Sequence, residues 1–337
     1  MRKPQNLSAA VRVALLLSLS LIVQAQEFPN FDRRSGIELF NQHRFREAVQ
    51  SLQRALKKSS DDYEAWYYLG LALAKTNDLK NATKSIERAL KLRPNSAEAH
   101  NGLAYIFLLR NKLADSISEA HVALNLDPQL AEPHYFIGVA RLRMDARKEA
   151  LDEAETAIKL NPRFPAAYLL KSQALVGFSG DAPVSDPKSP AETSRDRYRE
   201  AATALEHYLQ LNPDSENKET WVEQLESLKV YSAFHPSKGA DAIRSGNEVA
   251  VKAKVLSKPE PGYTEVARKS GTTGTVVLKA VLAADGKVKH ILVVKGLPDG
   301  LSETCIRAAR AIKFIPATID GKPVSQFIQL EYSFNLY

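Results

Sequence analysis

The sequence of 337 residues predicts an α-helical solenoid followed by a small α+β domain with an antiparallel sheet. Two observations predict this fold class. Alanines and prolines recur every 34 residues up to about residue 164, a period at which a helix pair cannot bury a core alone and must stack on its neighbours. Beyond about residue 250 the apolar period changes from that of a helix to that of a strand.

The first 25 residues are predicted to be a signal peptide and to belong to neither domain. Three basic residues precede an apolar run over 13–23, and Ala25 is the small residue that a signal peptidase requires before Gln26. The alternative is an uncleaved membrane anchor, but a run of eleven residues is short of the ~20 that a spanning helix needs. We therefore expect cleavage and export.

Four units of 34 residues follow, at 29–62, 63–96, 97–130 and 131–164. The second unit carries the full pattern of marker residues, which are Trp66, Leu69, Gly70, Leu73, Ala82, Ile86, Ala89 and Pro94. This pattern resembles the tetratricopeptide repeat (TPR), and the other three units keep it less fully. The resemblance implies that each unit is a pair of antiparallel helices.

A fifth unit is predicted to be split. Its first helix is expected over 165–178 and its second over 198–211, with an exposed loop at 179–197 that is rich in Gly, Ser, Asp and Pro. Trp221, Leu225 and Leu228 then share one helical face, as expected of a helix that caps the end of a solenoid. The TPR solenoid is thus predicted to span 29–231.

The TPR resemblance also implies a binding groove, because the first helix of each pair lines the concave face of such arrays. The residues predicted there are Tyr67, Leu71, Tyr105, Leu108, Tyr135, Val139 and Leu142. Tyrosines and aliphatic side chains favour an extended or helical apolar peptide as the ligand. The alternative is that some of them pack between repeats.

Residues 232–249 lack both periods and are predicted to be a linker to a C-terminal domain at 250–337. In that domain 275–282 alternates as a strand, Ala284-Asp285-Gly286 is typical of a hairpin turn, and 288–294 is β-branched and apolar.

A helix is predicted next, with Leu301, Cys305, Ala308 and Ile312 on its buried face and Asp299 as its N-cap. Cys305 is the only cysteine, so no intrachain disulfide can form. Its apolar neighbours indicate a buried structural thiol rather than a nucleophile.

The last strand has the clearest alternation of all. One set of residues points one way, namely Ile328, Leu330, Tyr332, Phe334 and Leu336, and the other set points the opposite way, namely Gln329, Glu331, Ser333 and Asn335. We expect one face of the sheet to be covered by helix and the other to be exposed to water.

Several motifs in this domain resemble the C-terminal domain of TonB-family energy transducers. They are Tyr263-Thr264-Glu265-Val266-Ala267-Arg268, Gly274-Thr275-Val276, Asp285-Gly286-Lys287-Val288, Lys313-Phe314-Ile315-Pro316-Ala317 and Gly321-Lys322-Pro323-Val324. The sequence departs from the family at Thr264, where proline is common, and at Ile312, where tryptophan is common.

The resemblance implies a periplasmic domain whose last strand lies at a sheet edge and captures an extended peptide of an outer-membrane receptor. The edge residues expected to dock it are Gln326, Ile328, Gln329, Leu330, Glu331, Tyr332 and Ser333. An edge strand offers unpaired backbone groups to an incoming strand. The alternative is an edge covered by the linker or by a second copy of the domain.

Energy transduction would require a spanning helix that contacts a motor, for which the family uses a polar residue within the membrane. The run at 13–23 contains only Ser18 and Ser20 as polar groups. The prediction is therefore a soluble periplasmic adaptor that binds envelope proteins, with TonB-dependent receptors as candidate partners. A membrane-anchored energy transducer is the alternative.

Other functional classes find little support. Residues 250–337 carry 13 Lys/Arg against 7 Asp/Glu, but the basic residues are scattered along strands, which does not favour nucleic acid. No catalytic motif is present, so neither an enzyme with a small-molecule substrate nor a cofactor is predicted. His100 and His134 occupy equivalent repeat positions and are expected to pack rather than bind metal.

Overall fold

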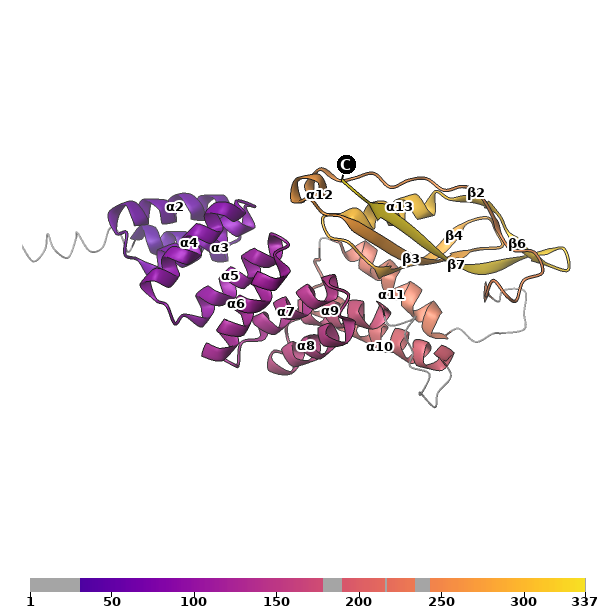
Figure 1. The fold of residues 1–337 in the computed structure, drawn as a ribbon, viewed down its shortest axis with the longest axis horizontal. Helices are drawn as coiled ribbons and strands as arrows, with labels where there is room; N and C mark the ends of the chain where they lie inside the picture. The colour runs from indigo at the N-terminus through magenta and orange to yellow at the C-terminus, as the bar shows by residue number, and fades with distance from the viewer. Residues whose placement is uncertain (1–30, 178–189, 216, 234–242, 337) are drawn as a thin grey trace, which may run out of the picture. The chain divides into compact units, whose positions relative to one another are not determined.

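The computed structural model describes residues 31–336 except 178–189, 216 and 234–242 (Figure 1). The predicted signal peptide, most of the predicted loop at 179–197 and the centre of the predicted linker lie outside the described residues. The chain divides into two compact units, residues 1–136 and 137–337, which are taken separately below.

Helices alone make up the described part of the first unit. After a helix over residues 31–41, they are α2 (Phe45–Lys58), α3 (Tyr63–Lys75), α4 (Leu79–Leu92), α5 (Ala97–Leu109), α6 (Leu113–Leu126) and the start of α7 (Ala131–Arg143). The starts of α3, α5 and α7 are 34 residues apart, as the repeat period predicts. The turns between paired helices use left-handed residues with the same period, at His43, Asn77 and Asn111.

Small residues allow the paired helices to approach closely. Ala48, Ala82 and Ala89 have no exposed surface. At Gly70 an added Cβ would lie 2.6 Å from the side chain of Ile86, so a larger residue there would force Ile86 to move. Ser116 replaces an alanine of the repeat, and its hydroxyl donates to the carbonyl oxygen of Ala104 at 2.8 Å. That bond satisfies a fully buried polar group.

The second unit combines the remaining helices with the sheet domain. Its helices before the sheet are the rest of α7, α8 (Arg147–Leu160), α9 (Pro165–Gly177), α10 (Pro190–Leu211) and α11 (Lys218–Ala233). The capping helix predicted from Leu225 and Leu228 is present as α11, and both side chains are buried. The predicted loop at 179–197 is wrong at its end, because α10 already begins at Pro190. Proline is favoured in the first turn of a helix, where its missing N–H costs nothing.

The strands form a five-stranded sheet and a small two-stranded one. The strands are β1 (Ile243–Arg244), β2 (Lys254–Ser257), β3 (Gly274–Leu282), β4 (Val288–Lys295), β5 (Lys313–Ile315), β6 (Ala317–Ile319) and β7 (Lys322–Phe334). The larger sheet has the order β1-β7-β3-β4 with β6 also on β7, and β2 pairs with β5. The hairpin predicted at Asp285 and Gly286 joins β3 to β4, and Gly286 has the positive φ it requires.

One face of the sheet is covered by α13 (Leu301–Arg310), and α12 (Glu265–Ser270) closes one end of that layer (Figure 1). Leu301 and Cys305 of α13 are fully buried, as predicted, against Leu278 and Leu330 of the sheet. Asp299 is not the N-cap, which is Gly300 in a left-handed conformation. The Asp299 side chain accepts instead from the hydroxyl of Thr272.

The opposite face of the sheet was predicted to be exposed to water, but part of it is covered by helices. Leu292 of β4 and Phe327 of β7 join one apolar core with Leu228 and Tyr231 of α11 and with Tyr198 of α10. Helix α11 runs along β4 (Figure 1). On this face, Gln329, Glu331 and Ser333 of β7 and Lys289 of β4 are exposed. The sheet of the second unit is therefore covered on one face by α13 and on part of the other by α10 and α11.

Candidate peptide-docking edge of the sheet

Strand β7 has partners on both sides only near its start. Its inner side pairs with β3 from Gln326 to Phe334. On its outer side β1 pairs in parallel with Ser325 and Gln326, within the predicted linker. Among the described residues, no strand pairs with this side beyond Gln326. Strand β1 thus covers the start of this edge, and no described strand covers the edge beyond Gln326.

The backbone groups that face this open side can be assigned. Ala283 N donates to Lys287 O in the hairpin to β4, so odd-numbered residues of β3 face β4 and even-numbered residues face β7. Their partners on β7, such as Leu330 and Tyr332, are also even-numbered. The N–H and C=O of Glu331 must therefore point outward, and Glu331 O does accept from the Lys258 ammonium at 2.8 Å.

The side chains of the predicted docking residues differ in exposure. Gln329, Glu331 and Ser333 are exposed, whereas Leu330 and Tyr332 are buried against α13. Burial raises the pKa of the Tyr332 phenol to about 12. Gln326 is also buried, and its amide oxygen accepts from Ala253 N at 2.8 Å. The prediction of Leu336 in the strand is wrong, because β7 ends at Phe334 and Leu336 is exposed.

The opposite edge of the sheet, at β4, is occupied by α11. The buried side-chain amide of Gln224 donates to Ile291 O at 2.8 Å and accepts from Val293 N at 2.9 Å. A residue of a parallel strand opposite Leu292 would make the same pair of bonds. The Tyr231 hydroxyl also donates to His290 O at 3.2 Å. These contacts were not predicted from the sequence, although Gln224, Ser227 and Tyr231 form a polar stripe on one face of α11.

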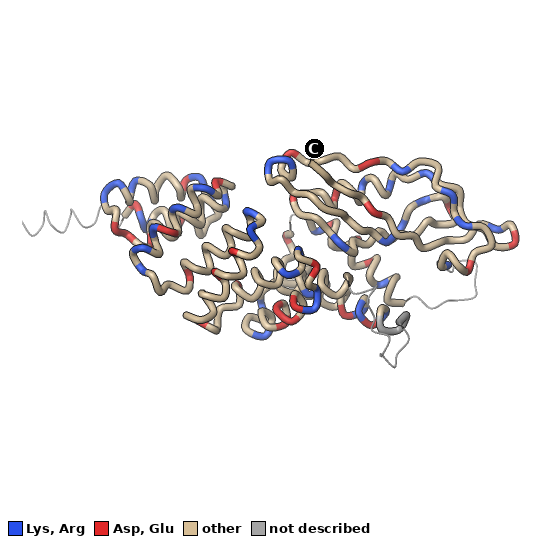
Figure 2. Tube along the Cα trace, in the orientation of Figure 1, with Lys and Arg blue, Asp and Glu red and all other residues tan. Residues whose placement is uncertain are grey.

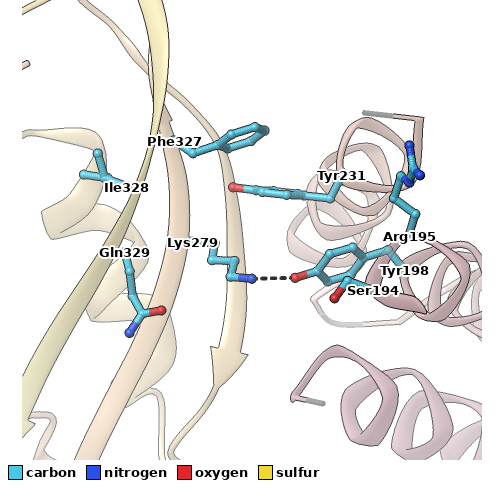
Figure 3. A pocket seen from close by; sticks show the side chains of 8 residues that line it. All are labelled: Ser194, Arg195, Tyr198, Tyr231, Lys279, Phe327, Ile328 and Gln329. Carbon is cyan, nitrogen blue, oxygen red and sulfur yellow. Dashed lines mark hydrogen bonds between the residues drawn. The ribbon is translucent and has the colours of Figure 1, made fainter. Parts of the chain in front are cut away.

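A pocket of about 370 Å³ lies between α10, α11 and the face of β3 and β7 (Figure 3). Its lining residues are Ser194, Arg195, Tyr198, Tyr231, Lys279, Phe327, Ile328 and Gln329. The rings of Tyr231 and Phe327 lie 5.2 Å apart, and the Lys279 ammonium donates to the Tyr198 hydroxyl at 2.8 Å. The lining contains two cationic side chains and no acidic one.

In the first unit, the predicted groove residues contribute strongly to packing. The side chains of Tyr67 and Leu71 pack against Gly102 of the next repeat, where an added Cβ would lie about 3.5 Å from each of them. Burial also raises the pKa of the Tyr67 phenol. Leu108 is only 5% exposed, which excludes it from a binding surface. Tyr105 and Tyr135 are half-buried and contact Phe136. In the second unit, Val139 and Leu142 are half-buried.

Reactive and metal-binding groups are sparse among the described residues. Cys305 is buried, and burial raises the pKa of its thiol to about 12, which disfavours the reactive thiolate. His100 contacts Glu119 and the carbonyl oxygen of Pro94. No group of three or more His, Cys, Asp or Glu in the described part of the chain is placed to hold a metal ion. None of the described helices is both long and apolar enough to span a bilayer.

Comparisons with known proteins identify both parts of the chain. Residues 33–85 and 77–131 match the tetratricopeptide repeat, and residues 259–336 match the Gram-negative bacterial TonB protein C-terminal. The Protein TonB of Vibrio cholerae serotype O1 is 33% identical over 85 residues, which are 25% of this chain and 35% of that relative. The chain thus spans about a third of the relative's length.

Solved structures similar to the chain include a thermophilic TPR protein. TTC0263 of Thermus thermophilus is 18% identical, with 60% of this chain and 99% of that chain covered and a TM-score of 0.48. MamA of Desulfovibrio magneticus RS-1 is also 18% identical, with 56% of this chain and 97% of the MamA chain covered and a TM-score of 0.42. The family matches confirm TPR units in the N-terminal part and a TonB-type domain at the C-terminus. The lysines and arginines of the C-terminal domain are spread over several elements (Figure 2).

Proposed function

We propose that the chain is an exported protein–protein interaction adaptor of the bacterial envelope, with β7 as the edge that captures an extended receptor segment. The observation that carries the proposal is the outward-facing backbone of Gln329, Glu331 and Ser333, which lies beyond the end of β1. Main-chain hydrogen bonds to such an edge give affinity for an added strand. The TPR part supplies the second binding surface, and Tyr105 and Tyr135 are its candidate contacts.

The test is to remove one outward N–H. Glu331→Pro deletes that donor without touching the ladder to β3, so the domain should stay folded while binding is lost. The probes are peptides tiled across the periplasmic segments of outer-membrane receptors, with binding measured by fluorescence anisotropy. Glu331→Ala is the matched control, because it removes the carboxylate and its contact with Gln329 but keeps the N–H.

Tyr332→Pro completes the design. Its N–H faces β3, so this variant should unfold the domain, at a cost of roughly 3 kcal/mol or more. Equal peptide binding by Glu331→Pro and Glu331→Ala would contradict strand addition at β7. A domain that serves only for dimerisation would show no binding of any peptide by the parent protein.

The second candidate is a membrane-anchored energy transducer of the TonB type, which the similarity to the Vibrio cholerae TonB protein favours. The two candidates differ in the fate of residues 1–25. N-terminal sequencing of the exported protein should find Gln26 first if the adaptor proposal holds. Full-length chain in inner-membrane fractions after an alkaline wash would favour the transducer.

A further inference from the structure

We propose that the pocket over β3 and β7 receives an aromatic side chain of the strand added to β7, so that α10 and α11 select the sequence of the captured segment. This inference rests on the proposed strand addition. It assigns to the last TPR helices a share in the binding site of the sheet domain.

The geometry of strand pairing places a side chain at the pocket. Successive side chains of a strand point to opposite faces, and directly paired residues point to the same face. Phe327 and Gln329 both point to the face where the pocket lies (Figure 3). A residue paired with Gln329 on its open side would have its Cβ about 4.5–5.5 Å from that of Gln329 and on the pocket face. Its side chain is then directed between β7 and α10.

The lining determines which side chain fits. The rings of Tyr198, Tyr231 and Phe327 form a nearly continuous aromatic wall, with centroids 5.6 Å and 5.2 Å apart along the series. Aromatic side chains favour such offset or edge contacts, and a volume of about 370 Å³ accommodates one ring. The ammonium of Lys279 and the guanidinium of Arg195 would attract the face of an added ring and repel a lysine or arginine.

The first experiment uses small probes and does not depend on strand addition. Toluene and p-cresol, the side-chain analogues of Phe and Tyr, are titrated while the ring resonances of Phe327 and Tyr231 are followed by NMR. We expect saturable shifts that Ser194→Phe abolishes, because Ser194 is half-buried at the pocket wall and a ring there would fill the space. Thr203→Phe is the matched control, since Thr203 is an exposed residue of the same helix outside the pocket.

The second experiment uses a receptor peptide found by the tiled screen. Its residues are replaced one at a time by Phe, Ala, Glu and Lys. One position should prefer Phe over Ala by about tenfold, as expected for a buried aromatic anchor, and Lys should be weakest there. Ser194→Phe should remove this preference while the backbone-dependent binding remains. Lys279→Met should reduce the discrimination against Lys.

The outcomes separate the two proposals. Saturable probe binding without peptide binding would support the pocket and contradict strand addition. Peptide binding without any preferred position, or with Glu preferred over Phe, would overturn the aromatic assignment and leave strand addition standing. An absence of probe shifts up to the solubility limit would overturn the pocket as a binding site.

Discussion

The two long strands nearest the edges of the sheet, β4 and β7, differ in how their outward backbone groups are satisfied. Both present a row of backbone groups that could pair with another chain. At β4 the buried amide of Gln224 takes the place of a neighbouring strand and bonds Ile291 O and Val293 N. At β7 the short strand β1 ends opposite Gln326. Farther along β7, the outward carbonyl of Glu331 accepts a hydrogen bond from the side chain of Lys258.

This difference indicates which edge is available for function. A buried amide that exchanges two hydrogen bonds is costly to displace, since both strand groups would lose their partners. A solvent-exposed lysine can be replaced by an incoming N–H with little loss. The bonds of Gln224 therefore close the edge of the sheet at β4, whereas the proposed strand addition is expected at β7. Substitutions at the two edges can test this asymmetry, from the largest expected effect to the smallest.

Gln224→Ala should have the largest effect on stability. It leaves a carbonyl and an N–H of β4 without partners in a buried place, at an expected cost of about 2–4 kcal/mol in the free energy of unfolding. Urea unfolding can be followed through Trp221 on α11 if Trp66, the other tryptophan, is replaced by Phe. Gln329→Ala at the exposed end of β7 is the matched control, for which we expect about 0.5 kcal/mol or less.

A loss of similar size in Gln224→Ala and Gln329→Ala would contradict the proposed asymmetry. Hydrogen exchange gives a second readout. The amide of Val293 should lose protection in Gln224→Ala, because its acceptor is gone, while amides in the centre of β3 should lose protection only through the drop in global stability.

Tyr231→Phe should cost less, about 0.5–1.5 kcal/mol, because one hydrogen bond to His290 O is lost while the ring contacts with Phe327 remain. The control is Tyr332→Phe on β7, whose buried hydroxyl has no hydrogen-bond partner among the described residues. Removing that hydroxyl should leave stability unchanged or raise it. The same chemical change in the helix that contacts β4 and in β7 itself should therefore give effects on stability that differ in size or sign.

Much of this architecture is predictable from the sequence. The 34-residue period predicted the starts of α3, α5 and α7, because a repeat places equivalent residues at equivalent points of the fold. The strict alternation of Leu330, Tyr332 and Phe334 likewise predicted which side of β7 is buried. In both cases a periodic pattern reports directly on a periodic structure.

The covered second face of the sheet was not predicted, although a signal existed. Ile291, Leu292, Val293 and Val294 form a continuous apolar run, which is typical of a strand buried on both faces. Neither β1 nor the role of Gln224 could be found in this way. A two-residue strand carries no period, and a glutamine on a helix gives no indication of a backbone partner 67 residues away.

The smallest effect is expected one residue before Gln224, at the ion pair between Glu223 of α11 and Arg310 of α13. Both side chains are about half exposed, so the coupling energy in a double-mutant cycle of Glu223→Gln and Arg310→Gln should be below about 1 kcal/mol. It should also fall in high salt, because screening acts fully on exposed charges. A coupling that exceeded the cost of Gln224→Ala and persisted in salt would show that α11 is held by charge rather than by its bonds to β4. In that case an acidic partner could detach α11, and the edge of β4 would become a second site for strand addition.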